Sequence, residues 1–459
     1  MGQHDRRAER GDGIAPGTVN RLASEMACSG CGASPRPEDP YPFRCPRSGA
    51  GDVDHVLVRV LYPTLVTWPR ETDPNPFIHY QTLMHSYHLA RAGGISDREY
   101  RSLVDRLDEG VARVDGHGFR VTECRRADEL SSDLGFSAKG GVWIKDETSN
   151  VGGSHKGRHL IDVAIHLAVV ARLGLTGSAA PPALAIASCG NAALAAAIVA
   201  RAAEYDLEVF VPIDAPTTIV SRLRRLGARI TVCSREPGIA GDPTYRRLGQ
   251  AIAGGSIPFT CQGNENGLII EGGETLGWEM TAAVERLDRV IVQVGGGALA
   301  SSIIQAFREA AQLGSISKLP RIDTVQTRGA FPLKRAYERV MAHAAAGQSP
   351  AEVIRYAATH RSEFMWPWEE TPQSIAEGIL DDETYDWLAV VTGMLLTGGQ
   401  ALVVDEELLE EANSAGREMA GFDVDHTGSS GLAGLLALVR QKAISPDENV
   451  AVLFTGVQR

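Results

Sequence analysis

The chain has 459 residues, of which 44% are hydrophobic, enough to bury cores in two or three lobes. Its 45 basic and 57 acidic residues give a net charge of −12, which argues against nucleic acid or an anionic membrane as the main partner. No run of about 18 apolar residues occurs and the start of the chain lacks the apolar core of a signal peptide, so we expect no membrane span. The seven cysteines are odd in number and mostly scattered, which indicates a reducing cytoplasm rather than a disulfide framework.

The amino-terminal part is predicted to be a tail followed by a cysteine-containing segment. The first twenty residues are polar and charged and predict a disordered tail. Cys28, Cys31 and Cys45 then follow in a knuckle-like spacing. A structural zinc ion takes four ligands in a tetrahedron. His55 is a candidate for the fourth ligand, and free thiols in a degenerate knuckle are the alternative. The tail and knuckle together occupy residues 1–75.

From residue 76 the pattern is helical and then alternates between strands and helices. We expect a helical extension over 76–135, with helices near 76–91 and 97–114. The strands predicted thereafter are 141–144, 183–187, 207–212, 228–233, 257–260, 290–294, 322–326 and 449–454. The helices predicted between them are 160–173, 192–204, 217–226, 243–253, 274–286, 298–312, 405–420 and 432–441. This alternation predicts an α/β fold of two open, mostly parallel twisted sheets with helices on both faces. The core is expected over 136–459, with a smaller lobe at about 183–260.

Lys156 stands where a predicted strand passes into a predicted helix. It follows Gly152, Gly153, Ser154 and His155. A desolvated amine near other cations loses its proton more readily and becomes nucleophilic. Lys156 is therefore a candidate for covalent chemistry on an aldehyde or ketone. His155 is a candidate for a second acid–base group or for a stacking side chain.

A glycine triplet, Gly295 to Gly297, lies between a buried strand and a helix. Glycines there let the backbone approach a ligand, and a helix start offers free N–H groups, so the loop predicts a phosphate site. Gly295-x-Gly297-x-x-Ala300 also fits a dinucleotide fingerprint. That alternative requires an acidic residue at the end of the next strand, whereas Asp323 falls early in it.

Two further loops open helices. Ser188-Cys189-Gly190-Asn191 could bind a carboxylate through backbone N–H groups, or simply cap the helix. Thr427-Gly428-Ser429-Ser430-Gly431 carries hydroxyls that could donate to a ring nitrogen or cap the helix that follows.

In their order along the chain, the four loops resemble those of the fold type II pyridoxal-phosphate enzymes, the group of the tryptophan synthase β-subunit and threonine synthase. The residues that match the family's lysine pattern are Lys145, Glu147, Gly153, Ser154, Lys156 and Arg158. The stretch from Glu271 to Glu279 resembles a threonine synthase motif. His155 replaces a phenylalanine, as in the tryptophan synthase β-subunit, and Ala192 stands where threonine synthases have threonine. The cysteine cluster also resembles the zinc-ribbon-like start of some threonine synthases.

The resemblance implies that Lys156 holds pyridoxal phosphate covalently and moves the substrate α-proton. It implies cofactor contacts by Lys156, Asn191, Gly295, Gly296, Gly297, Ala298, Leu299 and Ser430, with Asn191 at the ring 3′-oxygen. It implies substrate contacts by Ser154, Ser188, Cys189, Gly190 and Asn191. A serine, as a neutral partner of the ring nitrogen, favours loss of a β-substituent over transamination. A homodimer in the cytoplasm is expected by the same resemblance.

The leading hypothesis is a threonine synthase-like lyase that acts on a small L-amino acid by β- or β,γ-elimination or replacement. A serine or threonine ammonia-lyase and a β-replacement synthase of a nonproteinogenic amino acid are the enzymatic alternatives. A non-catalytic protein that binds pyridoxal phosphate is an alternative from another functional class. A substrate phosphate would need further donors, for which Arg158 and Lys139 are candidates. The polar, tryptophan-containing stretch 330–386 is a candidate for shaping a specialised substrate pocket. The sequence leaves the leaving group and any added nucleophile open.

Overall fold

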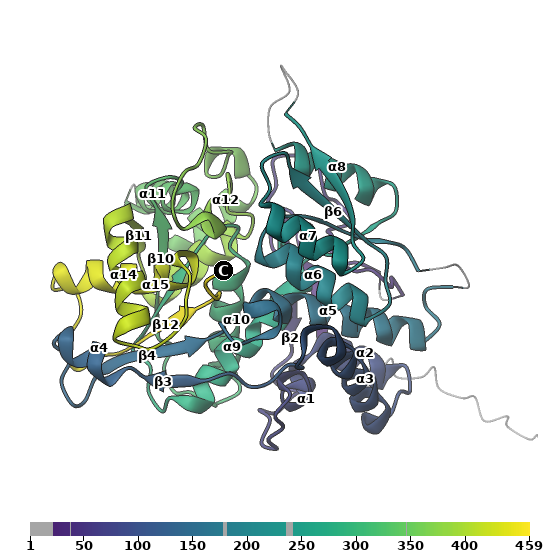
Figure 1. The fold of residues 1–459 in the computed structure, drawn as a ribbon, viewed down its shortest axis with the longest axis horizontal. Coiled ribbons are helices and arrows are strands. Elements are labelled where there is room, and N and C mark those ends of the chain that lie inside the picture. The colour runs from purple at the N-terminus through teal and green to yellow at the C-terminus, as the bar shows by residue number, and fades with distance from the viewer. Residues whose placement is uncertain (1–21, 37, 178–180, 236–241, 346) are drawn as a thin grey trace, which may run out of the picture.

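The computed structural model describes residues 22–36, 38–177, 181–235, 242–345 and 347–459. The tail predicted over the first twenty residues lies outside these ranges. Two sheets with their helices lie side by side, and the carboxyl terminus lies between the two halves of the molecule (Figure 1).

The larger half is built on a six-stranded sheet in the order β11-β10-β9-β12-β4-β3. Its strands are β3 (Cys124–Arg126), β4 (Gly141–Asp146), β9 (Arg289–Gln293), β10 (Arg321–Thr327), β11 (Ala401–Val404) and β12 (Asn449–Phe454). All neighbours are parallel except β3, which is antiparallel to β4. Every residue of β9 is buried, as expected of a parallel strand covered on both faces.

Two groups of helices cover this sheet. One group consists of α4 (Asp128–Asp133), α14 (Glu406–Glu418) and α15 (His426–Arg440). The other consists of α9 (Ile269–Ala283), α10 (Ala298–Gln312), α11 (Pro332–Ala345), α12 (Pro350–Ala358) and α13 (Trp387–Thr397).

The smaller half has four parallel strands in the order β7-β6-β5-β8. These are β5 (Leu184–Ala187), β6 (Leu207–Pro212), β7 (Arg229–Cys233) and β8 (Ile257–Pro258). The helices packed around it are α5 (Lys156–Arg172), α6 (Asn191–Ala202), α7 (Thr217–Arg225) and α8 (Pro243–Ala253). Parallel strands end at one edge of their sheet, so the loops after β4, β5 and β9 face the boundary between the halves. The predicted fold class is confirmed.

The amino-terminal region packs onto this core. It contains an antiparallel ribbon of β1 (Ser24–Cys28) and β2 (Leu57–Leu61), followed by α1 (Pro76–His79), α2 (His85–Ala92) and α3 (Asp97–Asp115).

Arg59 of β2 reaches into the core and meets three carboxylates. Its guanidinium pairs with Glu271 at 2.6 Å, with Glu309 at 2.8 Å and with Glu274, and all four side chains are almost fully excluded from solvent. Burial raises the pKa of Glu271 to about 7 and that of Glu274 well above its usual range, whereas the charge of Arg59 lowers both. The ribbon therefore supplies a buried counter-ion to the core.

Two expectations about elements differ from the structure. The helix predicted over 76–91 is interrupted, because Met84 is extended and the N–H of His85 donates to the Glu271 carboxylate at 2.8 Å instead of continuing a helix. The helix predicted over 432–441 begins earlier, at His426 with Asp425 as its cap, so the loop that contains residues 427–431 is helical. The sequence also gave no expectation for α13 or β11.

Among the residues described, no helix combines the length and apolar character needed to cross a membrane.

Candidate active site

Lys156 is the first residue of α5 and lies just beyond the carboxyl end of β4. A short turn, Val151–Gly153, joins the two elements, and Gly152 and Gly153 both have φ of +68°. A side chain at Gly153 would also come within 2.7 Å of Val457. The Lys156 side chain is half-buried, and no described residue forms a hydrogen bond or ion pair with its amine. The backbone thus fixes the position of Lys156, while its amine has no partner among the residues described.

Three helices begin around this lysine without a side-chain cap. They are α5 with His155 at its start, α6 with Gly190 and α10 with Gly297. In contrast, α15 is capped, because the Asp425 carboxylate accepts from the N–H of Gly428 at 2.5 Å. Uncapped helix starts offer free N–H donors and the positive end of the helix dipole, so they favour bound anions.

The two residues before Lys156 also carry polar atoms without partners. Ser154 is fully buried and its hydroxyl oxygen has no hydrogen bond, and the same holds for Nε2 of the nearly buried His155. Burial lowers the pKa of His155 well below its usual value, and the charge of Lys156 lowers it further. The ring is therefore neutral. Its Nδ1 lies 3.2 Å from the Thr455 carbonyl and carries the proton, which leaves Nε2 as an acceptor. Buried polar atoms without partners need an explanation, and a ligand bound beside Lys156 would supply one.

The glycine triplet has a second reason to exclude side chains. The segment of residues 379–386 packs on it, and a Cβ atom at Gly295 would lie 2.3 Å from the Asp381 carboxylate. A Cβ at Gly296 would lie 2.9 Å from Tyr385. The Thr384 hydroxyl donates to the Gly295 carbonyl at 3.0 Å and fixes the segment. The glycine loop therefore brings the stretch 330–386 against the uncapped start of α10.

Asp381 lies at the glycine loop and within the field of Lys156. Burial raises its pKa to about 6, while the charge of Lys156 and the N–H of Gly296 lower it. Asp386 has a similar position beside Gly297, and one oxygen of its buried carboxylate has no partner. Neither residue stood out in the sequence. The run from Asp381 to Asp386 is acidic, but only the fold shows that it reaches the glycine loop.

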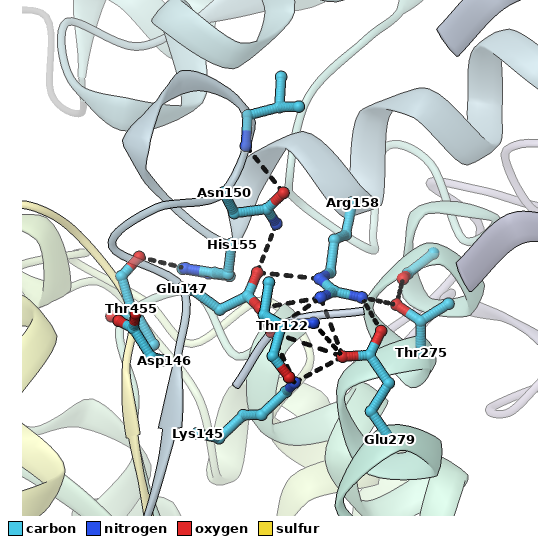
Figure 2. A network of polar contacts seen from close by, with 12 residues as sticks. Thr122, Lys145, Asp146, Glu147, Asn150, His155, Arg158, Thr275, Glu279 and Thr455 are labelled. Carbon is cyan, nitrogen blue, oxygen red and sulfur yellow. Dashed lines mark hydrogen bonds and ion pairs between the residues drawn. The ribbon is translucent and has the colours of Figure 1, made fainter. Parts of the chain in front are cut away.

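Three residues of the lysine motif, Lys145, Glu147 and Arg158, form a fully buried ionic network with Glu279 of α9 (Figure 2). Arg158 donates to Glu147 at 2.9 Å and to Glu279 at 2.5 Å. Lys145 donates to Glu279 at 2.5 Å and also to the Thr122 carbonyl at 2.7 Å. Arg158 is inaccessible to solvent and its donors are taken, so the suggestion that it binds a substrate phosphate is wrong.

Lys139, the other suggested phosphate ligand, lies at the opposite end of β4 from Lys156. It is exposed and precedes β4, whereas Lys156 lies beyond the carboxyl end of that strand. The dinucleotide alternative also fails, because Asp323 is buried in β10 and paired with Arg289 and Arg321.

The predicted substrate loop lies at the start of α6. The Ser188 hydroxyl accepts from the Gly190 N–H at 3.3 Å, and Cys189 is half-buried. Burial raises the pKa of Cys189, and the charge of Asp214 raises it further, so the thiol is protonated at neutral pH. The Asn191 side chain accepts a hydrogen bond from Arg459, a residue that the sequence did not single out. These residues gather on the side of the boundary formed by the smaller half.

Ser430 is fully buried in the first helical turns of α15 and does not lie in a loop before that helix. Its hydroxyl donates to the His426 carbonyl at 2.7 Å. An unprotonated ring nitrogen is an acceptor, so a contact with it would require this hydroxyl to rotate away from His426.

Away from this site, Cys28, Cys31, Cys45 and His55 come together. Their ligand atoms all lie within 4.8 Å of one another. The Cys31 and Cys45 sulfurs are 3.5 Å apart, and the Cys28 sulfur is 3.7 Å from His55 Nδ1. Ligands 2.3 Å from a tetrahedral zinc ion are spaced by roughly 3.8 Å. The arrangement has four ligands of the right kind and about the right spacing.

Comparison with solved structures places the fold. The chain is similar to diaminopropionate ammonia lyase of Escherichia coli, at 17% identity over 79% of this chain and 89% of that one, with a TM-score of 0.57. It is similar to maize serine racemase, at 19% identity over 78% and 93%, with a TM-score of 0.55. At such identities the likeness concerns the fold, which is that of the fold type II pyridoxal-phosphate enzymes.

The sequence comparisons give the family. A family model described as pyridoxal-phosphate dependent enzyme matches residues 117–456, so this chain belongs to that family. It is 23% identical to the threonine synthase of Methanosarcina acetivorans over 360 residues, which cover 73% of this chain and 74% of that protein. It is 26% identical to the threonine synthase of Methanocaldococcus jannaschii over 199 residues, which cover 43% and 42%. The resemblance inferred from the motifs and the cofactor pyridoxal phosphate are thus confirmed, and the roles of single residues stay predictions.

Proposed function

We propose that the chain is a pyridoxal-phosphate-dependent lyase that acts on a small L-amino acid by β- or β,γ-elimination or replacement, as a threonine synthase-like enzyme does. The observation that carries this proposal is the unpartnered Lys156 amine among three uncapped helix starts. Such an arrangement suits a lysine-bound aldehyde whose phosphate and whose substrate carboxylate each need N–H donors. The family relationship and the threonine synthase relatives support it.

The residues of this chain take separate roles in that reaction. When bound, pyridoxal phosphate supplies an electron sink for the carbanion formed at the substrate α-carbon. The N–H groups at Ala298 and Leu299 bind the phosphate at the start of α10. The N–H groups of the 188–191 loop bind the substrate carboxylate. Lys156 would hold the cofactor aldehyde and, with its amine released, would take the substrate α-proton and carry it to the leaving group. His155 stays neutral and offers its unpartnered Nε2 as an acceptor to the bound ligand.

An ammonia-lyase of serine or threonine is the second candidate, and one observation favours it. The Asp381 carboxylate lies at the glycine loop in the field of Lys156, and the donors of Arg158 are taken. A phosphate group on the substrate would meet that carboxylate rather than an added cation. A substrate without a phosphate avoids this repulsion.

A spectral screen separates these candidates. Purified protein loaded with cofactor is mixed with L-serine, L-threonine, O-acetyl-L-serine and O-phospho-L-homoserine, and the visible bands, ammonia and phosphate are followed. Phosphate release from O-phospho-L-homoserine identifies the threonine synthase-like reaction, and ammonia release from serine or threonine identifies the ammonia-lyase. New product from O-acetyl-L-serine with an added nucleophile identifies a β-replacement synthase. Silence toward every amino acid contradicts an enzymatic role.

We also propose that the amino-terminal knuckle binds one structural zinc ion through Cys28, Cys31, Cys45 and His55. The second shell supports this, because His55 Nε2 lies 2.9 Å from the Ala50 carbonyl and donates to it, which leaves Nδ1 free as a ligand. Metal analysis of the purified protein is expected to give one zinc per chain. Cys45→Ser should remove it, Cys124→Ser should not, and a zinc-free wild type would contradict the site.

A homodimer in the cytoplasm is proposed from the family resemblance, and the seven free cysteines are compatible with a reducing compartment. Light scattering on the purified protein tests the dimer, and a monomeric mass would contradict it.

A further inference from the structure

Arg459 reaches across the boundary between the halves to Asn191. One nitrogen of its guanidinium donates to Asn191 Oδ1, and another donates to the carbonyl of Gly152, four residues before Lys156. Asn191 begins α6 in the smaller half, whereas Arg459 follows β12 of the larger half. Figure 1 shows this end of the chain between the two halves.

This contact fixes which way the Asn191 carboxamide points. The oxygen and nitrogen of an amide are hard to tell apart by shape, so the assignment follows from hydrogen-bond partners. A guanidinium has only donors. The atom that faces Arg459 must therefore be the carbonyl oxygen, and the NH₂ group must point the other way.

The NH₂ group then faces the larger half. A Cβ atom at Gly456, beyond the end of β12, would lie 2.9 Å from Asn191 Nδ2, so this glycine leaves room for the amide. The ring 3′-oxygen of the cofactor, which the family resemblance places at Asn191, is an anionic acceptor and needs a donor. The positive charge on Arg459 also polarises the amide and strengthens its N–H bonds as donors.

Removal of Arg459 should leave the fold intact. Its side chain is exposed and borders an open cavity of about 370 Å³, which Asp115, His117, Ser149 and Arg222 also line. Loss of a side chain that faces such a cavity creates no buried void.

We infer that Arg459 is a positioning residue, which holds the Asn191 carboxamide so that its NH₂ group donates to the ring 3′-oxygen of bound pyridoxal phosphate. This role rests on the proposed function, because it takes the cofactor to be bound at Lys156 and Asn191. Arg459 itself touches neither cofactor nor substrate and acts only through Asn191.

A double-mutant cycle tests this role. Arg459→Ala, Asn191→Ala and the double variant are prepared with Arg222→Ala as control, since Arg222 lines the same cavity without contacting Asn191. Cofactor affinity is measured by absorbance titration, and the pH midpoint of the visible band is recorded. Arg459→Ala should weaken cofactor binding roughly tenfold and shift the midpoint, because a hydrogen bond to the ring oxygen is lost. Arg222→Ala should do neither, and Arg459→Lys, which keeps one donor, should recover part of the loss.

Two outcomes would overturn the inference. One is an Arg459→Ala protein that binds the cofactor with unchanged affinity and an unchanged midpoint. The other is an Arg459→Ala effect of the same size in the Asn191→Ala background, since residues that act through one another are non-additive. Failure of the proposed function differs from both, because the wild type would then release neither ammonia nor phosphate from any amino acid, whereas its cofactor affinity and the midpoint of its visible band are still measured.

Discussion

Lys156 and Arg158 lie two residues apart on α5, but they differ in burial and in their partners. Arg158 is inaccessible to solvent and donates to Glu147, Glu279 and other partners. Lys156 is half-buried and has no hydrogen-bond or ion-pair partner among the residues described. Both match the family's motif, so the motif alone does not separate them. A buried charge with all its donors taken stabilises the fold, whereas a half-buried amine without a partner, next to buried polar atoms that also have none, is available to a ligand.

The largest expected effect is that of Lys156→Ala. Loss of the amine removes both the cofactor attachment and the proton carrier, so turnover should fall by at least about a thousandfold. The visible band of the lysine-bound cofactor should disappear, while the urea midpoint changes little because no partner is lost. Lys139→Ala, at an exposed lysine far from the site, should leave both intact. Survival of both band and turnover in the Lys156→Ala protein would show that the lysine is wrongly assigned.

Arg158→Met should have the opposite signature. Removing one partner leaves the carboxylates of Glu147 and Glu279 buried without their main cation, which costs about 3–5 kcal/mol of unfolding free energy. Urea unfolding measures this loss. Arg172→Met at the far end of the same helix breaks only an exposed pair with Glu99, which is worth about 0–1 kcal/mol. Equal losses in the two variants would contradict a structural role for the network.

Gly297→Ala tests the glycine loop between these extremes. A methyl group there would lie 2.9 Å from Thr384, and the residue has φ of +101°, so we expect a loss of about 1–3 kcal/mol together with weaker cofactor binding. Gly314→Ala is the matched control, because Gly314 has φ of +74° in open space and carries the backbone strain without the crowding. Urea unfolding and cofactor titration measure the two effects. If the Gly297→Ala protein binds the cofactor as tightly as the Gly314→Ala control, the glycine loop does not bind the phosphate.

His155→Gln should have the smallest effect. Since burial and the charge of Lys156 hold the pKa of His155 well below its usual value, the ring loses its proton below the working range and does not titrate between about pH 6 and 8. Turnover should fall by less than about tenfold, as expected when a general acid–base role is absent. The pH–rate profiles of the two proteins should coincide over this range. A profile that loses one limb in the variant would instead make His155 the second acid–base group.

The sequence predicted the parallel strands other than β11 and most of their helices, because their apolar runs and periodicity are local properties. It failed over 76–91, where a carboxylate from α9 captures the N–H of His85 and breaks a helix that is periodic in sequence. It placed Lys156, the glycine triplet and the 188–191 loop at strand ends, which fold topology gathers at one boundary. Nothing in the sequence indicated Asp381 or Arg459, because each lies dozens of residues away along the chain from the loop that it contacts. It also misjudged Arg158, because a sequence does not show that donors are already taken.

The contact between Arg59 and three carboxylates has a consequence for any shortened form of this protein. A chain that began at residue 76 would keep both sheets but would have to neutralise Glu271, Glu274 and Glu309 by another route. Protons are the only substitute, and a buried carboxyl that holds its proton in the folded state favours folding at low pH and loses that advantage as the pH rises. Because Arg59 lowers the pKa values of Glu271 and Glu274 in the full-length protein, the trimmed protein would lose more stability between acidic and neutral pH than the full-length one.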